Sequence, residues 1–161
     1  MDRAAKAIEQ WKKERPDLDV SPMAVLGRLN EAASLIARER LAPLFASYGL
    51  QSGEFDVLAT LRRSGPPYAL TPTALYEATM VTSGAMTNRL DRLEKSGLIK
   101  RGPHPDDRRG IIVQLTGKGL ALIDEAVTVH VANEHQILSG LARPEQTMLA
   151  RLLEKLIASL S

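Results

Sequence analysis

The chain has 161 residues, of which 44% are hydrophobic and 25% charged, and it contains no cysteine. This length suits one domain with extended arms, and the composition allows it to bury a core. The lack of cysteine excludes disulfides, thiolate zinc sites and thiol redox sensing. No apolar run is long enough for a transmembrane helix, and the charged N-terminal segment has no hydrophobic stretch typical of a secretory signal. We therefore expect a cytoplasmic protein with no membrane partner.

Positive charge is concentrated in residues 82–118. The whole chain has 21 basic and 19 acidic residues, and this segment holds eight of the former and four of the latter. The segment therefore carries +4, and the rest of the chain carries −2. Clustered basic residues are typical of a surface that binds nucleic-acid phosphates. A solvated polar face would have the same composition.

Apolar residues at helical spacing predict a largely helical chain. Pro43 should kink or restart the long second helix, because proline cannot donate to the helical hydrogen-bond ladder. Ser52 and Thr82 are expected N-caps, and Gly49 and Gly97 are expected helix ends. The expected helices span residues 4–14, 23–47, 52–63, 72–78, 82–96, 117–139 and 144–160.

The hydrophobic pattern changes from helical to strand-like after residue 97. Two β-rich runs, 98–101 and 111–115, flank a proline-, aspartate- and glycine-rich loop with a basic tip, which predicts a β-hairpin. Two short helices joined by a tight turn and followed by a hairpin make a winged helix-turn-helix. The expected fold class is therefore mainly α with a small β-hairpin. The long helices outside this unit carry surplus apolar surface, which we expect them to bury in a homodimer.

Three segments of the chain carry a family resemblance. They are Phe55–Leu61, Thr82–Ile99, and the wing sequence Asp107–Arg109 with Val113–Gly119 behind it. Together they resemble the MarR family of bacterial transcription regulators, over roughly residues 23–160. The resemblance implies a homodimer that binds operator DNA through a winged helix-turn-helix in each subunit, usually as a repressor relieved by a ligand.

The resemblance also implies a domain organisation. Residues 1–22 form an N-terminal helix and a proline-containing linker, and residues 23–161 form a single domain. Within that domain the DNA-binding lobe spans about 52–116. The dimerisation helices span about 23–47 and 117–160.

Helix 82–96 resembles the recognition helix of such a lobe. Met86, Leu90 and Leu93 recur at helical spacing and should face the core. Small and polar residues remain on the other face, where they can approach base edges and phosphates. A polar solvent face is the simpler interpretation of the same pattern. The residues expected to contact DNA from this helix are Ser83, Gly84, Thr87, Asn88 and Arg92.

The hairpin tip supplies the second expected DNA contact. Arg108 and Arg109 lie there, and an arginine presented on a hairpin can enter a narrow A·T-rich minor groove. The resemblance implies that Asp107 orients Arg109. A solvated turn with a local ion pair is the alternative.

A narrower resemblance, to a urate-responsive subgroup of the family, concerns Trp11, Asp56, Arg89 and Arg101. It implies a small anionic effector, urate-like or a small carboxylate, bound between the N-terminal helix, helix 52–63 and the DNA-binding lobe. Arginines offer charge-assisted donors, an aspartate accepts ring N–H groups and an indole supplies a flat wall. Simpler roles are also open: the tryptophan could anchor the first helix, the aspartate could form an ion pair, and Arg89 could touch phosphate.

Other functions have less support in the sequence. The chain has no phosphate-binding glycine loop, thiol or histidine–carboxylate motif of known spacing, so we expect no enzyme activity, no catalytic residue and no cofactor. His130 and His135 are not at the usual same-face helical spacing, and we interpret them as surface or interface residues rather than metal ligands. A helical protein-interaction adaptor is the alternative function, against which the basic hairpin argues.

Overall fold

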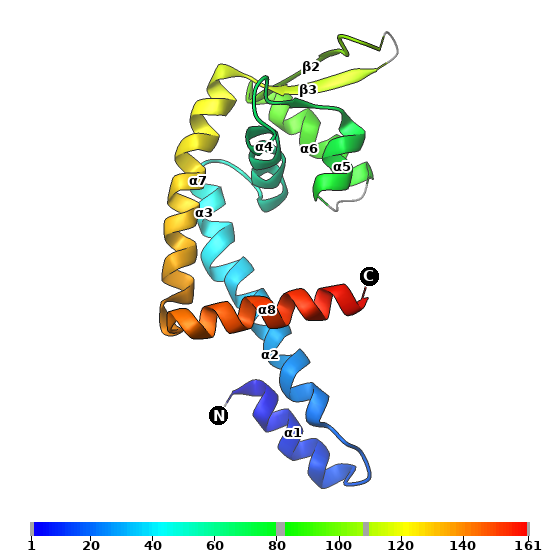
Figure 1. Ribbon diagram of the computed structural model, residues 1–161, viewed down its shortest axis with the longest axis vertical. Helices are drawn as coiled ribbons and strands as arrows, with labels where there is room; N and C mark the ends of the chain where they lie inside the picture. The colour runs from blue at the N-terminus through cyan, green and yellow to red at the C-terminus, as the bar shows by residue number, and fades with distance from the viewer. Residues whose placement is uncertain (1, 80–82, 108–109, 161) are drawn as a thin grey trace. The chain divides into compact units, whose positions relative to one another are not determined.

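The computed structural model describes residues 2–79, 83–107 and 110–160. The chain divides into two compact units, Met1–Pro43 and Leu44–Ser161. Figure 1 colours both units from the N-terminus to the C-terminus. Among the described residues, no helix combines the length and the apolar character needed to span a membrane.

Unit 1 is built from α1 (Arg3–Glu14), α2 (Ser21–Leu35) and a π-helical turn at Ile36–Leu41. Asp2 caps α1 by accepting the Ala5 N–H at 2.7 Å, and the same carboxylate accepts the Arg28 Nε of α2 at 2.8 Å. A hydrogen-bonded carboxylate at a helix N-terminus both satisfies a free N–H group and complements the helix dipole. The expected first helix is therefore confirmed, and it is tied to the second.

The long second helix is interrupted just before Pro43, as expected. The π-helical turn ends at Leu41, and α3 (Ala42–Ser47) restarts with Pro43 as its second residue. A missing N–H costs little in the first turn of a helix. Gly49, with φ of +70°, follows the end of α3 as expected.

Unit 2 contains the winged helix-turn-helix. The β2–β3 hairpin pairs in antiparallel register, with Arg101 opposite Val113, and the short β1 adds on the other side of β3. This third strand was not expected from the sequence, because two residues are too few to show an alternating pattern. The elements are α4 (Ser52–Arg63), β1 (Ala69–Leu70), α5 (Pro72–Thr79), α6 (Ser83–Lys95), β2 (Ile99–Pro103), β3 (Ile111–Leu115), α7 (Gly117–Ile137), a 3-10 turn (Leu138–Gly140) and α8 (Arg143–Leu160).

The core of unit 2 lies under α6. Met86, Leu90 and Leu93 are 3%, 3% and 1% exposed, which confirms the expected inward face of this helix. In Figure 1, α4, α5 and α6 gather beside the hairpin, and each of the three helices contacts the other two. The other fully buried side chains of this core include Leu58, Leu61, Leu75, Ile99 and Val113.

The N-cap of α4 differs from the expectation. Gln51 occupies the N-cap position, and Ser52 is the first helical residue. Glu54 stabilises this start of the helix, because its Oε2 accepts the Gln51 N–H at 2.8 Å, as the side chain of the third helical residue does in a capping box. The other expected cap, Thr82, lies outside the described residues.

The junction between α6 and the hairpin is fixed by backbone hydrogen bonds. Gly97, with φ of +73°, ends α6, and the Leu98 N–H donates to the Leu93 carbonyl at 3.0 Å in a Schellman arrangement. The Leu98 carbonyl in turn accepts the Thr116 N–H, just before α7 begins. Gly119 of α7 lies so close that a Cβ there would collide with the Leu98 carbonyl oxygen.

Gly119→Ala should therefore destabilise the protein by more than about 2 kcal/mol, because the obstacle is backbone rather than a mobile side chain. This sign is the reverse of the usual gain from replacing a helical glycine by alanine. Gly117→Ala in the same helix is the matched control, because a Cβ there meets nothing within 4 Å. Urea denaturation measures both variants, and equal effects at the two glycines would contradict the packing at Leu98.

Candidate DNA-binding and effector sites

The face of α6 opposite the core is polar and exposed. Gly84, Thr87, Asn88 and Arg92 are exposed, as the burial of Met86, Leu90 and Leu93 on the other side requires. A Cβ on Gly84 would meet nothing within 4 Å, so the backbone there is open to close approach. Ser83 begins α6, and its side chain is outside the described part of the structure.

Arg92 also has a partner that the sequence did not predict. Its Nε lies 2.7 Å from Oε1 of Glu54, whose side chain is only 3% exposed. The two oxygens of Glu54 thus face different elements, since Oε2 accepts the Gln51 N–H of the α4 cap. A buried carboxylate needs such partners to offset its desolvation. The three-residue spacing of Gln51 and Glu54 is that of a capping box, so the sequence contained a signal for the contact of Glu54 with the cap. It contained none for the contact of Glu54 with Arg92.

The described part of the hairpin loop is closed by its own backbone. The His104 N–H donates to the Gly110 carbonyl at 2.9 Å, and the Gly110 N–H donates to the Asp107 carbonyl at 3.0 Å. A Cβ on Gly110 would lie 2.9 Å from the Cβ of His104, so glycine suits this closure. Arg108 and Arg109, the expected minor-groove residues, lie outside the described residues. The expected orientation of Arg109 by Asp107 therefore stays a prediction.

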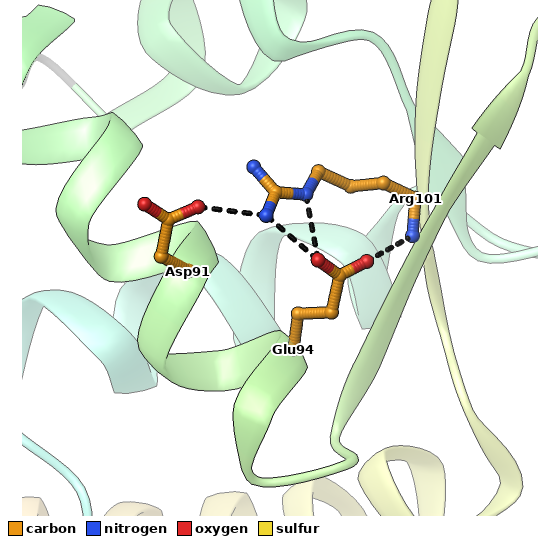
Figure 2. Close-up of polar contacts among 3 residues, drawn as sticks. All are labelled: Asp91, Glu94 and Arg101. Carbon is orange, nitrogen blue, oxygen red and sulfur yellow. Dashed lines mark hydrogen bonds and ion pairs between the residues drawn. The ribbon is translucent and has the colours of Figure 1, made fainter.

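Arg101 joins the hairpin to α6 (Figure 2). Its Nε and Nη2 donate to Oε2 of Glu94 at 3.0 and 2.7 Å, and its Nη2 also donates to Oδ1 of Asp91 at 2.7 Å. Hydrogen bonds from the Arg101 guanidinium and backbone hold the pKa of Glu94 below its ordinary value. The same carboxylates raise the pKa of Arg101. The structure therefore gives this expected effector residue two protein partners.

Asp56 lies on α4 and Arg89 on α6, and both are expected effector residues. Desolvation raises the pKa of Asp56, and the positive charges of Arg89 and Arg63 partly oppose this. The Arg89 guanidinium lies against Gly53, where any Cβ would overlap it. Its Nη1 is buried and has no hydrogen-bond partner within the described parts of the chain. An unsatisfied buried donor on an arginine is suited to an anion.

The fourth expected effector residue belongs to the other unit. Trp11 lies on α1, and its side chain is 44% exposed. An exposed indole on an amphipathic helix can serve as an anchor or as a flat ligand wall.

His130 is partly buried within the chain rather than a surface residue. Its side chain is 15% exposed, and its ring centroid lies 4.9 Å from that of Phe55 and 5.5 Å from that of Phe45. It therefore packs among α3, α4 and α7, where the two phenylalanines stack at 4.3 Å. Helical spacing alone could not show this, because the partners come from distant parts of the sequence. His135 is exposed, as expected.

The pair of Glu54 and Arg92 generates a stability prediction. Glu54→Ala and Arg92→Ala should each lower the free energy of unfolding by about 1–3 kcal/mol, because the first removes the acceptor of the Gln51 N–H and the second leaves a buried carboxylate without its ion pair. The double variant should lose less than the sum, since the two residues share one interaction. Urea denaturation tests this, with Asn88→Ala as an exposed control expected within about 0.5 kcal/mol of the unmodified chain. Strictly additive losses would show that the two residues are not coupled.

Comparison with known proteins agrees with this geometry. A MarR family model matches residues 48–110. The chain is 48% identical over 146 residues to the HTH-type transcriptional regulator PecS of Dickeya dadantii, covering 91% of this chain and 87% of that protein.

Two solved structures share the architecture. The first is a cysteine-to-serine mutant of MarR from E. coli complexed with operator DNA, at TM-score 0.72 and 27% identity, covering 91% of this chain and 96% of that chain. The second is Bordetella bronchiseptica BpsR, at TM-score 0.68 and 26% identity, covering 83% and 98%; it was solved to explain how 6-hydroxynicotinic acid regulates its DNA binding. The exposed face of α6, the adjoining hairpin and these relatives lead to one conclusion: the chain belongs to the MarR family of DNA-binding transcription regulators with a winged helix-turn-helix.

Proposed function

We propose that this protein is a homodimeric repressor that binds a pseudo-palindromic operator and is released by a small anionic effector. The observation that carries the proposal is the two-sided character of α6. Its apolar side is buried to 3% exposure or less at Met86, Leu90 and Leu93, and its polar side is exposed beside the hairpin. A helix presented in this way can enter a major groove while a wing reaches the adjacent minor groove.

The proposed DNA contacts come from α6 and from the wing. In α6, small side chains near the N-terminus permit close approach, and amide and hydroxyl groups can bond to base edges and phosphates. The complex of the E. coli relative with operator DNA supports operator DNA as the partner. The proposed contact residues are Ser83, Gly84, Thr87, Asn88, Arg92, Asp107, Arg108 and Arg109.

The proposed homodimer rests on apolar side chains that one chain leaves uncovered. None of the residues of α8, all of which the structure describes, is buried. Leu152, Ile157 and Leu160 of α8 are exposed, and so are Val25 and Leu26 of α2. Long helices with such faces are typical of obligate dimer interfaces, which bury about 1,000 Å² or more on each partner. We therefore assign residues 23–47 and 117–160 to dimerisation and about 52–116 to DNA binding.

Light scattering at micromolar concentration should give twice the mass of one chain. Leu152→Glu combined with Ile157→Glu should shift the protein toward monomer, because two charges would have to be desolvated in the interface. Both side chains are exposed in the single chain, so the fold should survive. Glu154→Lys, on the same helix, is the control and should remain dimeric. A monomeric unmodified protein would refute the dimer.

Arg109→Ala should weaken operator binding, and more strongly when A·T base pairs flank the site, because narrow minor grooves attract arginine. Each lost phosphate contact should also lower the slope of log affinity against log salt by about 0.9. Fluorescence anisotropy with a duplex selected from a random library measures both quantities. Lys13→Ala in unit 1 removes the same charge and should have little effect. An unchanged affinity and slope for Arg109→Ala would mean that the wing does not touch DNA.

The proposed effector is a flat or small organic anion, with urate as the first candidate. Nη1 of Arg89, which has no hydrogen-bond partner among the described residues, offers a donor, and Asp56, on which the charge of Arg89 acts, offers an acceptor. BpsR, whose DNA binding is regulated by 6-hydroxynicotinic acid, supports a small ring-containing acid as the chemical class. Arg101 and Trp11 complete the proposed set. For Trp11 the support is the sequence resemblance alone.

Urate should quench the fluorescence of Trp11, the only tryptophan, and should lower DNA affinity. Asp56→Asn should weaken the quenching and leave basal DNA binding largely intact, whereas Arg89→Ala should damage both, since that residue is part of α6. Glu77→Gln, an exposed carboxylate on α5, is the control. The emission must be corrected for absorption by urate. If millimolar urate changes neither signal, urate is the wrong ligand, and small carboxylates are tested next on the same variants.

A further inference from the structure

The contact between the C-terminal turn of α6 and the first strand of the wing is concentrated on one carboxylate. Oε1 of Glu94 accepts the backbone N–H of Arg101 at 2.9 Å, and Oε2 accepts Nε and Nη2 of the same residue at 3.0 and 2.7 Å. Both oxygens are thus committed to one residue of β2 (Figure 2). Asp91, one helical turn earlier, accepts a further bond from Nη2 at 2.7 Å. One carboxylate therefore holds both the backbone and the guanidinium of Arg101, and such charge-assisted hydrogen bonds are stronger than neutral ones.

The position of Arg101 in the strand explains why this contact reaches the wing. Side chains alternate along a strand, so Arg101 lies on the same face of β2 as Ile99, which is buried against the core. Ile99 holds the base of the hairpin by apolar packing. Arg101 continues the contact two residues further toward the tip, where its side chain is still only 32% exposed.

We propose that Glu94, assisted by Asp91, is a positioning residue for DNA recognition. It holds Arg101 and thereby fixes the angle of the β2–β3 wing relative to α6, so that helix and wing reach adjacent grooves together. Glu94 itself contacts no DNA in this scheme. The inference rests on the proposed wing contact, which Arg109→Ala tests separately.

The charges of Asp91 and Glu94 determine in which direction DNA affinity should change when one of them is removed. Asp91 and Glu94 lie on the recognition helix, where carboxylates repel phosphates. If they were only solvated charges, removing one would leave DNA binding unchanged or strengthen it. If Glu94 positions the wing, removing its charge must weaken binding even though the protein becomes more positive.

The experiment uses the full chain and a duplex selected by the unmodified protein from a random library. Glu94→Gln is the main variant, because it keeps the side-chain length and removes the ionic bonds to Arg101. Glu77→Gln on α5 is the matched control, an exposed carboxylate in the same lobe. The readouts are the dissociation constant, its salt slope and a hydroxyl-radical footprint, with thermal unfolding recorded for each variant.

Glu94→Gln should bind about three-fold more weakly, the order expected for one well-oriented exposed ion pair. Its footprint should lose the flanking minor-groove protection and keep the central protection, and its salt slope should fall. Adding Arg101→Met should cause a smaller loss than Arg101→Met causes alone, because Glu94→Gln has already broken the larger part of the same contact. Glu77→Gln should bind as tightly as the unmodified chain, or more tightly.

Unchanged or tighter binding by Glu94→Gln would overturn the proposal, as would a uniform loss of the whole footprint. If Glu94→Gln fails to fold, Asp91→Asn takes its place, since it removes only the bond to Nη2 and should cause a smaller selective loss of the flanking protection. Full flanking protection in that variant would equally overturn the proposal. If Arg109→Ala also keeps the flanking protection, the proposed wing contact is wrong and the positioning role fails with it.

Discussion

Burial of one face of α6 is the constraint on which the rest of the DNA-binding lobe depends. Met86, Leu90 and Leu93 are enclosed by the core that also contains Leu58 of α4 and Leu75 of α5. Three fully buried large side chains stabilise the fold by several kcal/mol, so this helix cannot rotate without a large cost. Its remaining face is therefore fixed toward solvent. The surface proposed to read DNA therefore follows from the packing on the opposite side.

The charge of the lobe is less available to DNA than the sequence suggests. Three of the arginines counted in the basic segment face carboxylates of the same lobe. Arg92 pairs with Glu54, Arg101 pairs with Glu94 and Asp91, and the charge of Arg89 acts on Asp56. An effector anion that takes Arg101 must compete with two carboxylates, and release of that residue would also free the first strand of the wing. Effector and DNA binding would then be coupled through differential contacts, as linkage requires.

Much of this could be predicted from the sequence, because local patterns determine local structure. The buried face of α6 follows from the spacing of Met86, Leu90 and Leu93, and the end of α6 follows from Gly97. The pairing of Arg101 with Glu94 could not be predicted, because it depends on how the strand returns over the helix. The packing of His130 between two phenylalanines has the same long-range origin. The cap at Gln51 was missed because Ser52 is the better isolated capping residue, whereas the Glu54 side chain satisfies the Gln51 N–H.

In the proposed complex, two copies of α6 read one DNA site from its major grooves. Methylation interference on the selected duplex tests this reading, because it reports contacts at guanine N7 in the major groove. Interference is expected in two segments whose centres are about one helical turn, or about 10 base pairs, apart, with symmetry about the midpoint. Interference in a single segment, or none at guanine N7, would contradict it.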